Sequence, residues 1–183
     1  MNNELPVPLP ESLDFIQHTD YIEIVRSWYG WHVYLLAFFC LMWDGFLVVW
    51  YSNAISEGDL IMFLFPLLHL AAGVGITYYT VATWLNKTYI YVSKTNFVVF
   101  HKPLPWFGKC EIPVNDLKQL YVKEKVRHNK NGTSVSYELH AILQSGKNKK
   151  LVTGLSDDTQ ALFIEQAIEQ YLDIQNQPVK GEY

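Results

Sequence analysis

The sequence predicts an α+β membrane protein, in which a hairpin of two transmembrane helices interrupts an antiparallel β domain closed by a C-terminal amphipathic helix. Three observations lead to this fold class. The chain has two apolar runs long enough to cross a bilayer, which takes about 20 residues in a helix. It has several short segments in which apolar and polar residues alternate, as in half-buried strands. It closes with a segment of helical periodicity.

The two apolar runs define the expected transmembrane helices, at 31–51 and 60–85. The first run carries a single charged residue, Asp44, and the second carries none. We do not expect the first run to be a signal peptide, because its N-terminal flank is acidic and no small-x-small cleavage site follows it. The segment 52–59 between the runs is the expected extracytoplasmic turn.

The distribution of positive charge predicts the orientation of the hairpin. Of the 14 lysines and arginines, Arg26 alone precedes the first run, none lies in the turn, and the others all follow the second run. Positive residues concentrate on the cytoplasmic side of membrane proteins. We therefore expect both termini in the cytoplasm.

The N-terminal residues are expected to join the soluble part. Residues 1–11 include the proline-rich stretch LPVPLP and form a flexible lead-in. Residues 12–30 read as a β-hairpin around a turn at Thr19 and Asp20, because YIEIV alternates. If both termini lie on one side of the membrane, this hairpin can pair with the later strands.

Residues 87–174 form the expected cytoplasmic domain. Alternating residues place Leu120, Val122 and Val126 on one face of a strand. The dipeptide Asn131–Gly132 is a strong hairpin signal. We expect an antiparallel meander, curved into a sheet or open barrel, with strands at 88–93, 96–101, 117–126, 134–143 and 149–154.

The segment 156–174 changes to helical periodicity. Ser156 is the expected N-cap, and the apolar stripe faces the sheet. The residues expected to face away into solvent are Glu165, Gln166, Glu169 and Gln170. A curved sheet with one plug helix is the outline of a pleckstrin-homology-like (PH-like) domain. Residues 175–183 are an expected frayed tail.

Several motifs over about residues 20–182 resemble a known group. The chain is similar to uncharacterised bacterial membrane proteins with two transmembrane helices and a PH-like cytoplasmic domain. This resemblance implies the bacterial inner (cytoplasmic) membrane, and it implies no catalytic residues because the group has no assigned activity. Some of its relatives carry a zinc ribbon whose cysteines this chain lacks. The resemblance rests on RSWY, WDGF, PLLHLAAGVGITYYTVATWLNKT, KPLPWFG, NGTSVSYELHAIL, TGL and QALFIEQAIEQYL.

Asp44 is the first candidate functional residue, because an ionisable group inside a bilayer costs roughly 2.5–3.5 kcal/mol and needs a partner. If the hairpin bends near residues 55 and 56, His69 differs from Asp44 by about 3 Å in depth. We expect an intramembrane Asp44–His69 pair. Two interpretations stay open: a polar clasp that sets the helix register, which we favour, and a proton- or ion-handling pair.

Small residues near this pair predict close helix packing. Pro66 is expected to leave the carbonyl of Met62 without its helical donor. The expected small-residue interface consists of Gly45, Ala71, Ala72, Gly73 and Gly75.

Two further segments are candidate contacts for lipid or a partner. A PH-like fold commonly presents basic hairpins to anionic lipid, although solvated hairpin tips explain the same pattern. These basic residues are Lys123, Lys125, Arg127, Lys130, Lys147, Lys149 and Lys150. The loop after the strand 96–101 carries Trp106 and Phe107 directly after two prolines, and it can dip into the interface, dock on a partner or simply connect strands.

Together these features predict a membrane-anchored, non-enzymatic interaction or scaffold module that binds a protein partner or anionic lipid. The alternative is a small accessory subunit of a transport or proton-coupled complex that uses Asp44 and His69. Its expected partners are membrane lipids and a membrane protein or a second copy of the chain. We expect no cofactor, no metal and no disulfide, because the only cysteines, Cys40 and Cys110, lie in different parts. The net charge of −4 argues against nucleic-acid binding, and no catalytic motif is present.

Overall fold

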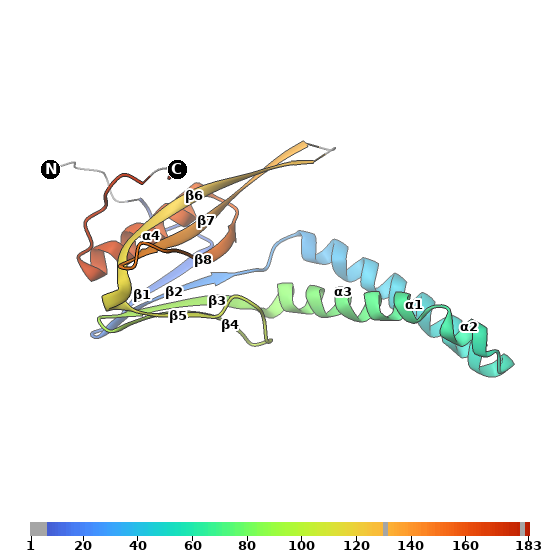
Figure 1. Ribbon diagram of the computed structural model, residues 1–183. Helices are drawn as coiled ribbons and strands as arrows, with labels where there is room; N and C mark the ends of the chain where they lie inside the picture. Colours follow the sequence, from blue (N-terminus) through green and yellow to red (C-terminus); the bar gives the residue numbers. More distant parts are fainter. Residues whose placement is uncertain (1–6, 130–131, 180–181) are drawn as a thin grey trace. The chain divides into compact units, whose positions relative to one another are not determined.

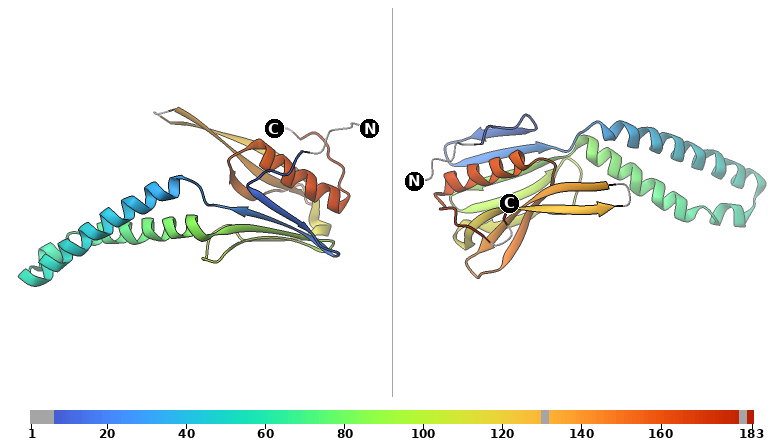
Figure 2. Two further views of the ribbon diagram at one scale, coloured as in Figure 1. Left: turned by 180° about the vertical axis from the view of Figure 1, so that it is seen from behind. Right: turned by 90° about the horizontal axis from the view of Figure 1, so that it is seen from above.

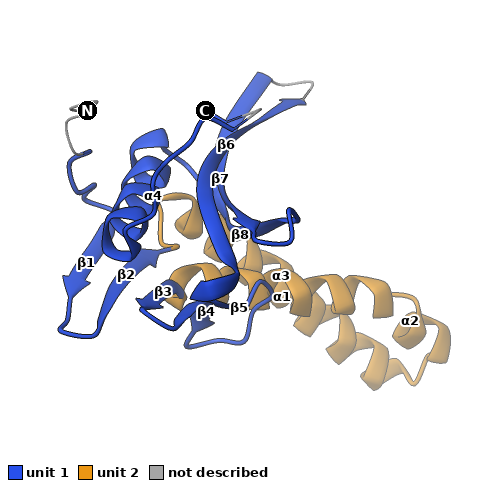
Figure 3. Cartoon of the chain, turned by 60° about the vertical axis from the view of Figure 1, so that its left-hand side comes forward, with its two compact units in different colours: residues 1–27, 87–183 blue, residues 28–86 orange. Residues whose placement is uncertain are grey.

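In the computed structural model, which describes residues 7–129, 132–179 and 182–183, strands from both sides of the apolar runs pair with each other. Strand β2 (Tyr21–Ser27) and strand β3 (Lys87–Ser93) are antiparallel neighbours, from Tyr21 opposite Ser93 to Ser27 opposite Lys87 (Figure 1). The points where the chain leaves and re-enters the sheet are therefore adjacent. A β domain, Met1–Ser27 with Lys87–Tyr183, is interrupted by a helical unit, Trp28–Asn86 (Figure 3).

The β domain contains two antiparallel sheets. The first has five strands in sequence order, and its hairpin β1–β2 is the N-terminal segment. The second has three strands in the order β6-β7-β8. The remaining bounds are β1 Leu13–Gln17, β4 Asn96–Lys102, β5 Cys110–Pro113, a short 3-10 turn η1 Val114–Asp116, β6 Leu117–Asn129, β7 Gly132–Leu143 and β8 Asn148–Leu155.

Helix α4 (Asp158–Leu172) packs against both sheets (Figure 2). Its residues Ala161, Ile164 and Ile168 are fully buried in a core that also draws on every strand of the domain. The ring of Phe163 meets Phe15 of β1 edge-on at 5.7 Å. This apolar stripe recurs every three or four residues, which is why the segment folds as a helix on a sheet.

The structure corrects details of the predicted β domain. Strand β5 was not predicted, because its four residues are too few to show alternation. Strands β6 and β7 extend as a two-stranded ribbon beyond the core, so Val126 and Val135 pair with each other but are exposed. The N-cap of α4 is Asp157, whose carboxylate accepts a hydrogen bond from the amide of Thr159, and not Ser156.

The helical unit has a longer first helix than predicted. Helix α1 (His32–Glu57) continues through most of the expected turn and ends at Gly58 in a left-handed conformation. The hydroxyls of Ser52 and Ser56 bond back to carbonyls one turn earlier, which keeps these polar residues helical. Asp59 then caps the next helix by accepting from two amides.

The second predicted span is broken at Pro66. It consists of α2 (Leu60–Leu64) and α3 (Leu67–Leu85), because proline removes one helical hydrogen bond and clashes with the preceding turn. The carbonyl of Met62 accepts a hydrogen bond from the indole of Trp50 at 2.9 Å. By length and composition, His32–Glu57 and Leu60–Leu85 could each cross a membrane.

Candidate functional site

The basic residues of β6 share one face of the β6–β7 ribbon. Lys123, Lys125 and Arg127 are alternate residues of a strand, so their side chains lie on the same side. Lys150 of β8 lies opposite His140 of β7, on this same side of the sheet. We call these four cations the basic face.

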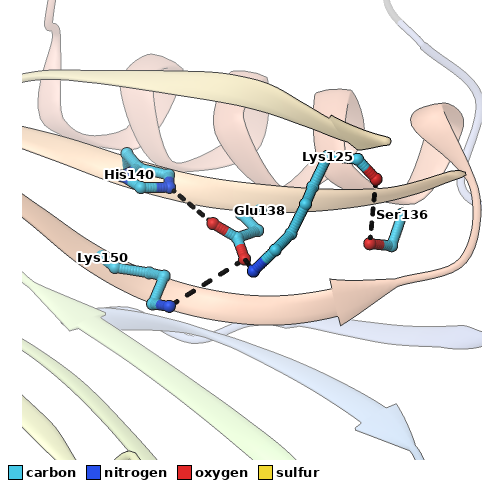
Figure 4. Close-up of polar contacts among 5 residues, drawn as sticks. All are labelled: Lys125, Ser136, Glu138, His140 and Lys150. Atoms are coloured by element: carbon cyan, nitrogen blue, oxygen red, sulfur yellow. Dashed lines mark hydrogen bonds and ion pairs between the residues drawn. The ribbon is translucent and has the colours of Figure 1, made fainter. Parts of the chain in front are cut away.

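One carboxylate lies within the basic face and is held by three partners (Figure 4). Glu138 of β7 accepts hydrogen bonds from Lys125 Nζ at 2.7 Å and from His140 Nε2 at 3.1 Å, and Lys150 Nζ lies 3.9 Å away. Burial opposes ionisation of Glu138, but these hydrogen bonds and charges outweigh it and lower its pKa. Glu138 is therefore ionised at neutral pH. Four cations against one carboxylate leave a net positive excess on this face.

The predicted basic residues do not form one patch. Lys149 lies opposite Ala141, and its Nζ approaches the carbonyl of Glu111 on β5 at 3.5 Å. Lys147 is exposed in the turn before β8. Lys130 lies outside the described residues. The basic face is thus smaller than the sequence suggested, because successive residues of β8 point to opposite sides of the sheet.

The loop after β4 presents one apolar side chain to solvent. Phe107 is 90% exposed, whereas its neighbour Trp106 is partly buried. His101, near the end of β4, contacts Thr88 Oγ1 at 3.0 Å and hydrogen-bonds to the backbone of Phe107. Burial lowers the pKa of His101, helped by the charge of Arg26. This histidine fixes one end of the loop.

The basic face and this loop occupy the same end of the β domain. In Figures 1 and 2 the β6–β7 ribbon and the loop between β4 and β5 extend toward the same end of the domain. Lys102, the last residue of β4, lies opposite Lys87, the first of β3. This is the end at which the chain enters and leaves the helical unit.

In the helical unit, Asp44 is held by Thr77 and not by His69. Thr77 Oγ1 donates a hydrogen bond of 2.7 Å to Asp44 Oδ2. The ring of His69 instead stacks on Trp43 at 5.8 Å and on Phe65 at 6.2 Å. The reason is the longer α1: the bend lies at Gly58, so Asp44 is level with a later turn of α3 than predicted.

The small-residue interface is also different. A Cβ on Gly73 would lie 3.0 Å from the ring of Trp43, so this glycine permits the close approach of the helices. The other four predicted positions, Gly45, Ala71, Ala72 and Gly75, are exposed. The buried residues of α1 recur every seven positions, a spacing that the sequence shows but that its many apolar residues obscure: Val33, Cys40, Leu47 and Ala54.

The sequence analysis missed two buried carboxyls on α4. Glu165 and Glu169, which were expected to face solvent, are 3% and 6% exposed. They line a pocket together with described residues of the C-terminal segment, which therefore lie against α4 instead of fraying: Ile174, Asn176, Pro178, Glu182 and Tyr183. Tyr183 donates from its amide to the carbonyl of Val122 at 3.0 Å and from its hydroxyl to Asp158 at 2.7 Å. Only knowledge of where the tail packs could have revealed this burial.

Comparison with known proteins adds no further constraint. No protein-family model and no curated protein matches the sequence. Over the described ranges, no group of three or more His, Cys, Asp or Glu side chains is arranged to hold a metal ion.

Proposed function

We propose that this chain is a membrane-anchored, non-enzymatic binding module whose β domain attaches to acidic phospholipid headgroups through the basic face. The observation that carries the proposal is the alignment of Lys123, Lys125 and Arg127 on one side of the ribbon, two of them exposed. Phospholipid phosphates attract such cations, each contributing about 1 kcal/mol near an anionic surface.

The exposed helices support membrane anchoring. In the apolar windows of the two candidate spans, 17% and 11% of the residues are buried. Helices of a soluble core would be mostly buried, whereas apolar side chains exposed over this length are stable in lipid. The absence of positive residues from the turn supports an orientation with both termini in the cytoplasm, and the resemblance given by the sequence motifs supports a bacterial inner membrane.

The position of the loop after β4 supports attachment at the bilayer surface. Lys87 directly follows the residue that caps α3, and Lys102 lies opposite Lys87. The loop therefore begins within one strand spacing, about 4.8 Å, of the point where the chain leaves the second span. From there Phe107 can enter the interface while the basic face meets headgroups. Two antiparallel sheets closed by α4 also support the PH-like assignment.

A fluorescence titration tests this function. The full chain carries an environment-sensitive dye at Ser134→Cys, an exposed ribbon position, in nanodiscs with an increasing fraction of phosphatidylglycerol in phosphatidylcholine. We expect the dye signal to shift with the anionic fraction and to revert at high salt, which screens these charges. The double variant K123E/R127E should weaken the response about 30-fold or more, from about 1 kcal/mol per lost cation.

The variant K118E/K147E is the matched control, because it makes the same change in net charge at exposed lysines outside the basic face and outside the loop after β4. It should respond nearly as the wild type does. If both variants lost the response equally, the response would depend on the net charge of the chain and not on the basic face. The dye signal could instead fail to respond to anionic lipid, while the chain captures a protein partner in a way that requires Lys123 and Arg127. That result would show that the basic face binds a protein and not lipid. The transport alternative called for an Asp44–His69 pair, whereas Asp44 accepts a hydrogen bond from Thr77.

A further inference from the structure

A pocket of about 920 Å³ lies between α4 and the C-terminal segment, away from the basic face. Its walls combine polar and apolar groups. The polar lining comes from Glu165, Glu169 and Glu182 and from the amides of Gln166, Gln170 and Asn176. The apolar lining comes from Leu162, Ile174, Pro178 and Tyr183. No lysine, arginine or histidine is among these described lining residues.

Two of the carboxyls in this pocket are buried without a full set of partners. The Oε1 atoms of Glu165 and Glu169 are inaccessible to water and have no hydrogen-bond partner. The carboxyl group of Glu169 does accept a hydrogen bond from the backbone amide of Leu120, on the open edge of β6. A buried carboxylate without a positive partner destabilises the folded protein. Such a group therefore either stays protonated or is stabilised by a bound cation.

We propose that this pocket binds an organic cation, an alkylammonium or alkylguanidinium group, whose charged head pairs with Glu165 and Glu169. An ammonium has three donors and a guanidinium five, which suits a wall to which Glu165, Glu169 and Glu182 all contribute carboxyl groups. The apolar stem of the ligand packs on Leu162 and Ile174. An inorganic ion would gain nothing from that apolar wall.

The protonation of the site makes binding depend on pH. Burial, together with the charges of Glu169 and Glu182, raises the pKa of Glu165 to about 8. Burial and Glu182 raise the pKa of Glu169 to about 7, against the opposing Leu120 amide. The other titratable group in the described lining is the hydroxyl of Tyr183, which is engaged by Asp158. An arriving cation must therefore displace protons, and its affinity rises with pH.

The test is calorimetric titration of the full chain in detergent with butylammonium chloride, against potassium chloride and 1-butanol as probes. We expect saturable binding of butylammonium alone, with proton release that varies with the buffer's ionisation enthalpy. Affinity should fall about tenfold or more between about pH 9 and about pH 6, because protons then compete for the carboxyls. Butylammonium stays charged over this range, as a lysine side chain does.

Glutamine variants locate the site. E165Q and E169Q should each weaken binding by about tenfold to a hundredfold, the loss expected for one charge-assisted hydrogen bond, and the double variant should abolish it. E124Q, at an exposed glutamate of β6, is the matched control and should bind as the wild type does. Glutamine is isosteric with the protonated glutamate, so these variants keep the fold, which circular dichroism checks.

A further variant distinguishes binding of a free amine from occupation of the site by a lysine of the chain itself. Lys180 lies in the same C-terminal segment and outside the described residues. If the cation of this site were the Lys180 ammonium, K180Q would tighten butylammonium binding by removing a competitor, and that result would overturn a site for an external ligand. Equal affinity in K180Q and wild type supports the proposal. Absence of saturable binding, equal binding of 1-butanol, or binding that survives E165Q/E169Q would refute it.

Discussion

Glu138 and Glu165 are both buried glutamates of the β domain, yet their surroundings move their pKa values in opposite directions. Glu138 is 7% exposed, and hydrogen bonds from Lys125 and His140, with the charges of Lys150 and Lys125, lower its pKa. Glu165 is 3% exposed, faces other carboxyls, and has a pKa of about 8. Burial raises the pKa in both places, and only the first site supplies enough positive charge to reverse it.

This difference separates two uses of a buried carboxyl. The Glu138 site is complete, because lysines and a histidine of the same sheet satisfy its charge, and it holds the basic face in shape. The Glu165 site is incomplete in the described residues, because α4 and the tail offer it carboxyls and apolar groups. A complete site stabilises the fold, whereas an incomplete one costs stability whenever it ionises.

The largest expected effect is a loss of stability with rising pH. Above pH 4.5 the unfolded chain gives up the proton of Glu165, while the folded chain keeps it until about pH 8. The folded state then binds more protons, so stability falls as pH rises through this window, by on the order of 5 kcal/mol in total. The melting temperature of the full chain in detergent should fall between about pH 5 and pH 8.

The double variant E165Q/E169Q should remove most of this slope, because glutamine does not titrate. Its melting temperature should exceed that of the wild type above pH 8 and differ little near pH 5. A slope of unchanged size in the double variant would mean that other groups drive it, and would remove the contrast between the two sites.

A smaller effect is expected at the complete site. Lys125→Met removes the 2.7 Å hydrogen bond to Glu138 and should cost about 1–2 kcal/mol at neutral pH, less than a fully buried charged pair because the lysine side chain is 38% exposed. Glu138 has a lowered pKa, so its contribution is lost as pH falls through that pKa. The cost should therefore shrink as the pH falls below 4.5 and through the lowered pKa of Glu138.

Lys123→Met is the matched control, since Lys123 is an exposed residue on the same face of the same strand and is not among the groups that lower the pKa of Glu138. It should change the melting temperature little, as most exposed surface substitutions do. If both variants lost the same stability, the loss would come from removing any positive charge of the basic face and not from breaking the contact with Glu138.

The sequence correctly predicted helices and strands in segments where one periodicity dominates. It did not predict contacts between residues that are far apart in the chain. Alternation located β6 and β7, and the three- and four-residue stripe located α4. The same stripe misplaced Glu165 and Glu169, because it reports the face toward the sheet and says nothing of a tail that packs on the neighbouring face. That tail bonds to Val122 and Asp158, which are far from it in sequence.

The same limit explains the unpredicted partner of Asp44. Composition correctly showed that Asp44 needs a polar partner, but the identity of that partner depends on where the helices turn. Continuation of α1 to Glu57 moves the bend, so that Thr77 lies at the level of Asp44. Within this helix the hydroxyls of Ser52 and Ser56 bond to carbonyls one turn earlier. Serines in an apolar helix read as turn residues when the hydrogen bonds they make are unknown.

The smallest effect on stability is expected at Asp44, a carboxyl whose hydrogen-bond partner, Thr77, is neutral. Thr77→Val keeps the side-chain shape and removes the 2.7 Å hydrogen bond to Asp44. Interhelical hydrogen bonds in membranes contribute about 0.6 kcal/mol on average and at most about 1.7. Unfolding of the full chain by SDS in mixed micelles should shift by this amount. His69→Phe keeps the stacking on Trp43 and should shift it less. A larger loss for His69→Phe than for Thr77→Val would restore the Asp44–His69 pair, and with it the proton-handling alternative.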